Sequence, residues 1–246
     1  MVNPVRVVWL TLAPDTIARG YWDQGMLESI FARDLWRVPG GYEFEHVELV
    51  CPTDDALWAA VEPGGILVLP ARHHADKVLA RRVWWAVRRM SWCLLILTGD
   101  EEGEFDAERF LGVQHARAWV MTPQPGREYG ERAFLFGTGW PPGIRAACAG
   151  IADIVAADQV YAPDRPWMFA GQVTHARREE CAEMLRARPD RDLALLEETP
   201  GFTQGIDQRV YWLEMTNAKI APAPSGPCSP DSFRCFEALE AGCVPI

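Results

Sequence analysis

Two stretches of this chain carry side chains that could move a proton. The first is residues 14–24 (PDTIARGYWDQ), where Trp22 and Asp23 come immediately before a segment with helical spacing. Asp23 could act as a general base that points into a crevice, with Trp22 as an apolar platform beside it. The alternative is that Asp23 only begins the helix, because an acidic residue is favoured in the first turn. Both interpretations of Asp23 stay open.

The second stretch, residues 98–105 (TGDEEGEF), crowds four carboxylates into five positions, and it includes Asp100 and Glu101. Such crowding raises the pKa of any carboxyl group that is also withdrawn from water, which suits proton abstraction and makes Asp100 a candidate base. Carboxylates also accept hydrogen bonds from sugar hydroxyls, a role we assign to Glu101. A run of acids at a turn is equally typical of a solvated surface.

Two adjacent histidines, His73 and His74, follow another apolar run. At least one of them could face a crevice as a hydrogen-bonding or acid–base group. We expect no metal there, because no third ligand lies at a recognisable spacing. Asp190 and Asp192 have the D-x-D form that metal-dependent sugar transferases use, but they lie in an arginine-rich polar turn, which favours a surface position.

A candidate anion site lies at residues 224–234 (PSGPCSPDSFR), where small residues lead into a predicted helix. Ser229, Ser232 and free backbone amides could hold a phosphate there, with Arg234 one turn into the helix, because a helix N-terminus carries partial positive charge. The pattern is neither a P-loop nor a G-x-G-x-x-G fingerprint. Taken alone, it is also typical of an ordinary helix start.

The composition limits the partners of the chain. Its 246 residues include 34 acidic and 24 basic side chains, a formal charge of -10, which disfavours non-specific binding to nucleic acid. Residues 75–90 are an exception, because basic side chains there surround Trp84 and Trp85. This segment could be a nucleic-acid face, but the sequence favours a solvated basic face with buried tryptophans.

The cysteines and the first residues bear on location. Seven cysteines are scattered, odd in number and without a C-x-x-C pair, which favours reduced and mostly buried thiols. The apolar run at the start is too short for a membrane span and lacks the cleavage region of a secretory signal. We therefore expect a soluble, cytoplasmic protein.

Strand-like apolar segments alternate with helical patterns along the chain, which predicts parallel βαβ units in a doubly wound sheet. We therefore expect an α/β fold with two Rossmann-like halves, residues 1–157 and a short or incomplete second half of residues 158–246. The predicted strands are 5–12, 42–50, 66–69, 94–98, 118–121, 167–170, 193–196, 219–223 and a last one beginning near 243. The predicted helices are 24–35, 53–61, 75–90, 144–157, 176–187, 208–216 and 230–241, and residues 122–143 are expected to be rich in loops.

Two segments of the second half share a recognisable pattern: FAGQVTHARRE (169–179) and YWLEMTNAKIAPAPSGPCSPDSFRCFEALEAGCVPI (211–246). They contain a strand ending in F-x-G, a following arginine, a strand leading into P-x-G, an aromatic–arginine pair, E-A-L-x-A-G and a final P-I. This pattern resembles the donor-binding half of an exostosin-like glycosyltransferase of the two-Rossmann GT-B type. The first half resembles a GT-B acceptor domain only in its alternation of strands and helices.

The resemblance implies roles for the donor-binding side chains. In such enzymes the glutamate of the E-A-L-x-A-G helix binds the ribose hydroxyls of the donor nucleotide, which gives that role to Glu237. Arg234, with Arg177 or Arg178 after Gly171, would neutralise the diphosphate leaving group. GT-B enzymes generally do this without a bound metal.

The resemblance also bears on the catalytic base. Inverting GT-B enzymes commonly take it from the N-terminal half, often from the loop after the first strand, where Asp23 stands, and Asp100 is the second choice. Some retaining enzymes carry a second acid seven residues from the glutamate. Positions 230 and 244 are Pro230 and Val244, which favours inversion.

We therefore expect a metal-independent, inverting glycosyltransferase that needs no cofactor. It would move a sugar from a nucleotide-sugar donor, a UDP-sugar by preference, to a hydroxyl acceptor that is a glycan or, as a second option, a modified nucleic acid. A nucleotide-sugar epimerase of the same fold and a non-catalytic sugar- or partner-binding relative are the alternatives. A GT-B domain continues beyond the last residues seen here, so the chain is expected to be truncated at its C-terminus. The expected acceptor-binding residues are Trp22, His73, His74 and Glu101.

Overall fold

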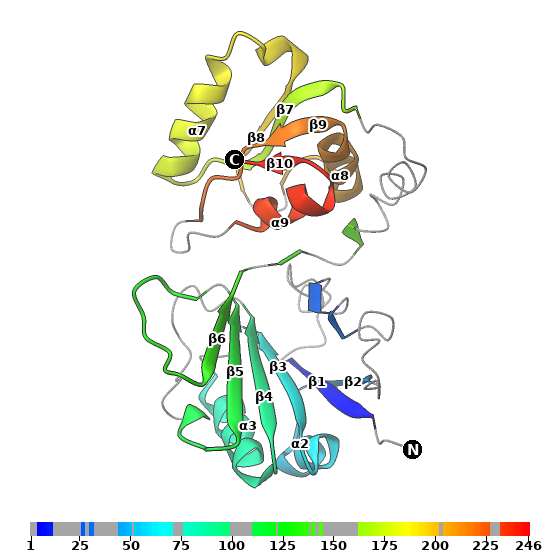
Figure 1. Ribbon diagram of the computed structural model, residues 1–246, viewed down its shortest axis with the longest axis vertical. Helices are drawn as coiled ribbons and strands as arrows, with labels where there is room; N and C mark the ends of the chain where they lie inside the picture. The colour runs from blue at the N-terminus through cyan, green and yellow to red at the C-terminus, as the bar shows by residue number, and fades with distance from the viewer. Residues whose placement is uncertain are drawn as a thin grey trace. The chain divides into compact units, whose positions relative to one another are not determined.

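The chain forms two compact units, Met1–Thr138 and Gly139–Ile246, which Figure 1 shows in a computed structural model. Each unit is described by itself. The expected boundary between residues 157 and 158 lies outside the described residues. Those are residues 4–11, 26–27, 30–31, 44–50, 52–70, 76–98, 110–121, 123–137, 139–140, 143–144, 162–201, 204–226 and 232–246.

The first unit is built on a six-stranded sheet in the order β2-β1-β3-β4-β5-β6. Every neighbouring pair in it is parallel, as the alternation of strands and helices predicts. Five of its strands confirm predicted ones, and β6 lies in the segment that the sequence assigned to loops. The strands are β1 (Val5–Thr11), β2 (Phe44–Val50), β3 (Gly65–Pro70), β4 (Cys93–Thr98), β5 (Ala116–Met121) and β6 (Ala133–Phe136).

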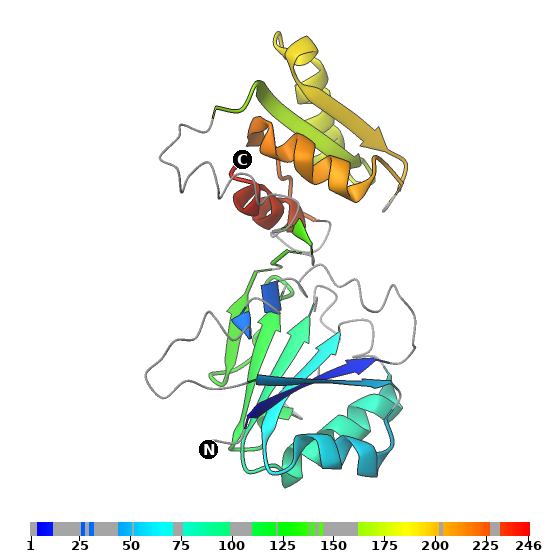
Figure 2. The same ribbon diagram turned by 90° about the vertical axis from the view of Figure 1, so that its right-hand side faces the viewer.

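Two helices, α2 (Asp54–Val61) and α3 (Lys77–Arg89), cover one face of this sheet (Figures 1 and 2). Each begins at a side-chain cap. Thr53 accepts a hydrogen bond from the Ala56 amide at 3.2 Å, and Asp76 accepts one from the Leu79 amide at 2.7 Å. Both helices bury their apolar sides against alternate residues of β1, β3, β4 and β5, so hydrophobic burial holds this layer in place.

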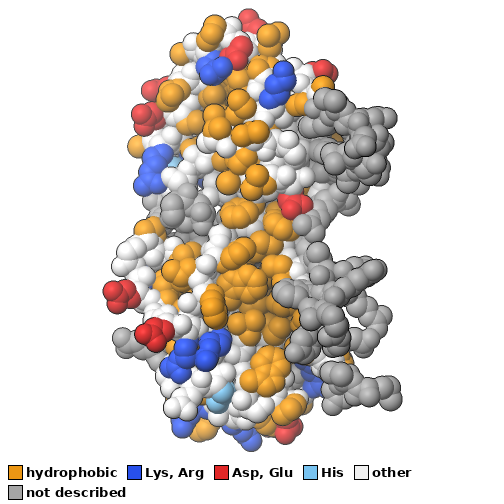
Figure 3. Space-filling model, viewed as in Figure 1, with side chains coloured by type: hydrophobic (Ala, Val, Ile, Leu, Met, Phe, Trp, Pro, Cys, Tyr) orange, Lys and Arg blue, Asp and Glu red, His pale blue; other side chains and the backbone are white. Residues whose placement is uncertain are grey.

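The opposite face of the sheet is aromatic over β5 and β6. Trp119 alternates with residues that pack toward the helices, and its ring meets Phe136 edge to face at 5.2 Å between centroids. Phe134 and Phe136 of the edge strand are both exposed. Figure 3 shows hydrophobic side chains gathered on this face. The sequence pattern does not indicate β6, because all four of its residues are apolar. A half-buried strand is recognised by the alternation of apolar and polar residues, and this alternation is absent from β6.

The second unit contains a four-stranded parallel sheet in the order β10-β9-β7-β8. The predicted strand 193–196 is displaced, because Arg191–Leu193 forms a 3₁₀ turn before β8 begins. The strands are β7 (Arg165–Gln172), β8 (Leu195–Thr199), β9 (Ala218–Ala221) and β10 (Val244–Pro245). The helices are α7 (Ala176–Arg186), α8 (Gln208–Thr216) and α9 (Phe233–Glu240), which confirm the predicted ones.

Helices pack on both faces of this second sheet. Trp167 and Phe169 of β7 pack with Leu185 of α7 on one face. Met168 and Ala170 of the same strand pack with α8 and α9 on the other. The alternating side chains of β7 therefore separate two apolar layers, as in a doubly wound sheet.

Both units follow the same path through their first four strands. The chain adds its second strand on one side of the first strand and its third strand on the other. The order therefore reverses between β1 and β3 in the first unit and between β7 and β9 in the second. The protein is thus an α/β protein with two Rossmann-like halves, the second of them short. Ligands of such sheets bind where the order reverses, at the carboxyl ends of the strands.

No helix within the described ranges is both long and apolar enough to cross a membrane.

Candidate functional site

The loops after β7 and β9 meet at the point where the strand order of the second unit reverses. Arg177, near the start of α7, donates from Nη1 to the Ser225 hydroxyl at 2.5 Å and to the Gly226 carbonyl at 3.3 Å. Ser225 and Gly226 follow β9. Arg177 therefore joins the two loops that border this reversal.

Arg234 reaches the same strand end from α9. Its Nη2 donates to the Ala170 carbonyl at 2.7 Å, and its guanidinium carbon lies 4.5 Å from the centroid of the Phe169 ring. Only 8% of the residue is exposed. Its Nε and Nη1 are also buried, and neither makes a hydrogen bond of ordinary geometry among the described residues, although the Tyr211 hydroxyl lies near enough to interact with the guanidinium. Two buried donors without well-placed acceptors are costly, and an arginine in this state is suited to receive an anion.

Gly171 makes room for Arg234. A Cβ atom added at Gly171 would stand 2.1 Å from Nη2 of Arg234, far inside contact distance. Side chains alternate along β7, so a side chain at residue 171 would point to the same face as Trp167 and Phe169, which is the face covered by α7. The guanidinium of Arg234 occupies that space and therefore lies on the α7 side of the sheet. Burial raises the pKa of the Cys181 thiol on α7, and the charge of Arg234 opposes that rise.

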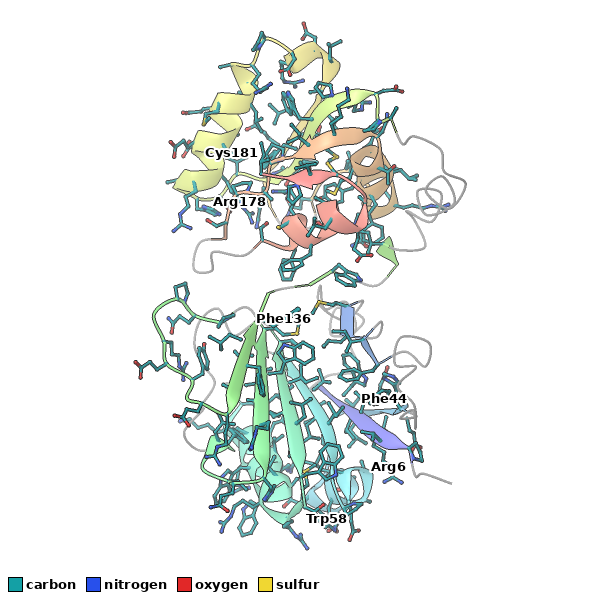
Figure 4. The ribbon with its side chains drawn as sticks, viewed as in Figure 1. Arg6, Phe44, Trp58, Phe136, Arg178 and Cys181 are labelled. Atoms are coloured by element: carbon teal, nitrogen blue, oxygen red, sulfur yellow. The ribbon has the colours of Figure 1, made fainter. Side chains whose placement is uncertain are left out.

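The first turn of α7 adds further positive charge. Figure 4 labels Arg178 and Cys181, which belong to α7, and Arg178 donates to the Gln172 carbonyl at 3.5 Å. His175 caps the helix without a side-chain bond to it. Burial, helped by Arg178 and Arg177, lowers the pKa of His175, whose Nε2 is buried with no partner in the described part of the chain. Together with the helix N-terminus, these groups form an electropositive strand end.

Glu237 lies on the same helix as Arg234, and only 4% of it is exposed. Its Oε2 accepts from the Tyr211 hydroxyl at 3.0 Å, and its Oε1 accepts from Trp212 Nε1 at 3.5 Å. Burial raises the pKa of Glu237, while Arg234 and the two donors oppose the rise. Burial likewise raises the pKa of Tyr211. Glu237 is therefore an internal carboxyl group held by α8 and coupled to Arg234.

The structure brings together most of the expected donor-binding residues. Arg177, Arg178 and Arg234 surround the end of β7 beside Gly171, and Ser232 is buried as the N-cap of α9. The Ser232 side chain makes no cap bond to that helix. Ser229 lies outside the described residues.

The expected catalytic and acceptor-binding residues of the first unit also lie outside the described residues. The strands before them can still be placed. β1, β3 and β4 are neighbours and parallel, so their carboxyl ends at Thr11, Pro70 and Thr98 share one edge of the sheet. The residues concerned are Trp22, Asp23, His73, His74, Asp100 and Glu101.

Sequence reasoning missed three members of the site, namely His175, Tyr211 and Ser225. His175 could have been found, because it stands between a predicted strand and a predicted helix at the expected anion-binding end. Tyr211 and Ser225 carry no such signal, since each acts through a partner 26 or 48 residues away in the chain.

No cluster of three histidine, cysteine or acidic side chains suited to a metal occurs among the residues that the structure describes. Asp190 of the D-x-D pair accepts from Arg188 at 2.8 Å and from Trp167 Nε1 at 3.0 Å. These donors lower the pKa of Asp190, whose carboxylate therefore serves the turn itself.

No protein-family model, no curated protein and no solved structure matches this chain.

The buried carboxyl group makes a testable prediction about pH. Because burial raises the pKa of Glu237 above its ordinary 4.5, the folded state holds this proton more tightly than the unfolded chain. Its contribution to stability is complete below pH 4.5 and is lost as the pH rises through the raised pKa. His175 has the opposite pH dependence. Its pKa is lowered from the ordinary value of 6.5, so the folded state favours the neutral ring. The contribution of His175 to stability is therefore complete above pH 6.5 and is lost as the pH falls through the lowered pKa.

Glu237→Gln separates the two contributions. The free energy of unfolding of the wild type, minus that of Glu237→Gln, is expected to decrease steadily as the pH rises from about 4.5. Urea titrations at several pH values measure this difference. Glu180→Gln, at an exposed position on α7, is the control and is expected to keep the wild-type profile. A difference that is constant with pH contradicts the prediction.

Proposed function

We propose that the second unit binds a nucleotide-sugar and that the chain transfers the sugar to a hydroxyl acceptor. The observation that carries this proposal is Arg234, whose two buried nitrogens at the carboxyl end of β7 make no hydrogen bond of ordinary geometry among the described residues. A diphosphate supplies acceptors for them. The first turn of α7 adds Arg177, Arg178 and a helix N-terminus in a chain of net charge -10, so positive charge is concentrated where the fold class places its ligands.

The proposed reaction uses these groups on the leaving side. The acceptor oxygen attacks the anomeric carbon, the bond from that carbon to the diphosphate oxygen breaks, and its electron pair leaves with the diphosphate. Charge on the diphosphate grows as the bond breaks, so arginines that contact it stabilise the transition state more than the ground state. The guanidinium groups perform this task without a metal ion.

The acceptor proton goes to a carboxylate of the first unit in this proposal. Asp23, which follows β1 in the chain, is the preferred base, and Asp100, which follows β4, is the second choice. A single displacement of this kind inverts the anomeric centre. The acceptor is proposed to be a glycan, and a UDP-sugar is the preferred donor.

Glu237 is proposed to bind the donor ribose. A carboxylate offers about four acceptor positions, and Tyr211 and Trp212 use two of them. The remaining lone pairs suit a cis-diol. The same two donors fix the orientation of the carboxyl group, so Glu237 is positioned before the nucleotide arrives.

Thermal denaturation with a panel of ligands tests the donor site. The panel contains pyrophosphate, UDP, GDP and their common sugar conjugates. A ligand at a hundred times its dissociation constant stabilises the fold by about 2.7 kcal/mol, so the best ligand is expected to raise the melting temperature by roughly 5–10 °C. Arg177→Ala is expected to abolish most of the shift, whereas Arg209→Ala, an exposed arginine on α8, keeps it.

Two outcomes decide the proposal. If no nucleotide or nucleotide-sugar raises the melting temperature, or if Arg177→Ala shifts as the wild type does, the donor site is wrong. If a nucleotide-sugar binds, release of its nucleoside diphosphate is followed with and without a mixture of glycan acceptors. Release that depends on the acceptor supports transfer. Binding without release contradicts transfer and leaves the epimerase and the non-catalytic binder.

A further inference from the structure

The outward face of α3 in the first unit combines arginines with exposed tryptophans. Arg81, Trp85 and Arg88 follow one another at helical spacing and are all exposed. Trp92, beyond the end of the helix, is also exposed, and its ring lies against Gly64. Trp85 is 52% exposed and Trp92 is 41% exposed. The sequence favoured tryptophans buried under a solvated basic face, and for Trp85 that expectation is wrong. Large exposed aromatic rings mark interaction sites.

A hollow between α2 and α3 borders this row, and indole rings from both helices line it. Trp58 of α2 and Trp85 of α3 belong to its lining, together with Asp54, Arg82, Ala86 and Arg89. The guanidinium carbon of Arg89 lies 4.7 Å from the centroid of the Trp58 ring. The hollow therefore offers π-faces and positive charge side by side.

The basic residues of α3 outnumber the acidic residues that α2 brings to this face, which are Asp54, Asp55 and the C-cap residue Glu62. The sequence of α3, KVLARRVWWAVRR, contains five basic residues and no acidic one. Arg82 is engaged with Asp54 at 3.2 Å and with the Pro52 carbonyl at 2.7 Å. Arg88 lies over Trp84, 4.7 Å from the ring centroid, and Arg81 is exposed. In a chain of net charge -10, this face is a local concentration of positive charge.

We propose that the face formed by α2 and α3 binds single-stranded nucleic acid. Every nucleotide carries a negatively charged phosphate and an aromatic base. Helix α3 presents a partner for each, namely the exposed arginines for the phosphate and the indole of Trp85 for the base. Bases stack on Trp85 and at the hollow beside Trp58, while Arg81 and Arg88 contact phosphates. Such binding is tolerant of sequence, because every base has a π-face.

The chemistry favours nucleic acid over other polyanions. An acidic peptide without aromatic residues satisfies the arginines but leaves the exposed indole of Trp85 uncovered. An anionic glycan can cover an indole, but a sugar ring has no π-face for the guanidinium groups that lie over Trp58 and Trp84. A nucleobase stacks on indole and guanidinium alike. Each nucleotide therefore supplies both the charge and the ring, whereas a peptide needs an acidic and an aromatic residue side by side to do so.

Fluorescence anisotropy with a labelled oligothymidylate of about 20 nucleotides tests the proposal. Binding is expected with a dissociation constant on the order of 10⁻⁵ M or tighter at low salt. It is expected to weaken with salt with a logarithmic slope of about -0.7 per phosphate contact. Trp85→Ala is expected to weaken binding about ten-fold, a typical loss for one stacked base.

Two matched variants separate charge from stacking. Arg81→Glu with Arg88→Glu is expected to reduce the salt slope by about 1.4, which is the loss of two phosphate contacts. Trp85→Phe, which keeps a π-face, is expected to restore most of the affinity that Trp85→Ala loses. Arg209→Glu, on α8 of the second unit, is the charge control and is expected to bind as the wild type. Circular dichroism shows that each variant is folded.

Three results would overturn the proposal. One is no anisotropy change at any salt concentration. Another is equal binding by Trp85→Ala and the wild type, which reduces the surface to a non-specific polyanion site. The third is displacement of the oligonucleotide by polyglutamate or dextran sulfate at equal charge concentration, which assigns the surface to an acidic protein or an anionic glycan.

Discussion

Replacing Arg234 with alanine is expected to destabilise the second unit by about 3 kcal/mol, because removing one member of a buried charged network leaves the others uncompensated. The substitution removes the hydrogen bond to the Ala170 carbonyl and the contact with the Phe169 ring. It also leaves Glu237 buried without the positive charge that opposes the rise of its pKa. Charged hydrogen bonds contribute about 1.5–3 kcal/mol each, so the loss is large for a small unit.

Native-state hydrogen exchange read by peptide locates the effect. Peptides that contain β7 and α9 are expected to exchange faster by a factor of about 100, which corresponds to roughly 3 kcal/mol at 1.4 kcal/mol per factor of ten. Peptides of the first unit are expected to keep their protection. Arg209→Ala is the control and is expected to change stability by less than about 0.5 kcal/mol, as exposed positions do. Unchanged protection of β7 in Arg234→Ala would contradict the prediction.

Arg234 also illustrates a conflict between stability and binding. Its Nε and Nη1 are buried and make no hydrogen bond of ordinary geometry in the described residues, so the folded chain carries a desolvation cost that an apolar side chain would avoid. Replacing buried charged groups with apolar ones of similar volume is often neutral or stabilising. The chain keeps the guanidinium at the strand end where its fold class binds ligands, which is the physical reason to assign Arg234 to a binding site.

The fold was largely predictable because both sheets are parallel. Buried parallel strands are continuous apolar runs, and the runs that contain Leu67 and Leu95 are of this kind. β6 was not predictable, since its exposed Phe134 and Phe136 lie in a segment rich in proline and glycine. The start of β8 was misplaced because the turn at Arg191–Leu193 contains an apolar residue.

The site was predictable only in part, because its geometry depends on contacts between distant residues. A helix start after small residues indicates where Ser232 and Arg234 stand. No sequence pattern shows that Arg234 crosses to the end of β7, or that Tyr211 holds Glu237. The exposure of Trp85 also escaped prediction, because apolar spacing on α3 does not tell which aromatic residue faces the sheet.

Gly171→Ala is expected to destabilise the second unit by about 2 kcal/mol, the usual range for inserting an atom into a packed site. The added Cβ would stand 2.1 Å from Nη2 of Arg234, and it must displace the guanidinium from the Ala170 carbonyl. Gly171 does not have a positive φ, so the alanine backbone itself is unstrained. The cost is therefore expected to arise from Arg234, which supplies the three atoms nearest to the added Cβ.

A double-mutant cycle tests that origin. Adding Gly171→Ala to Arg234→Ala is expected to cost less than about 0.5 kcal/mol, which gives a coupling energy of roughly 2 kcal/mol between the two positions. Gly201→Ala is the control, because its added Cβ would lie 3.3 Å or more from the Gln204 side chain, and its effect is expected to be the same in both backgrounds. Urea unfolding of the four proteins supplies the free energies. If Gly171→Ala costs as much without the arginine as with it, the glycine serves the strand itself rather than the passage of Arg234 to the α7 side of the sheet.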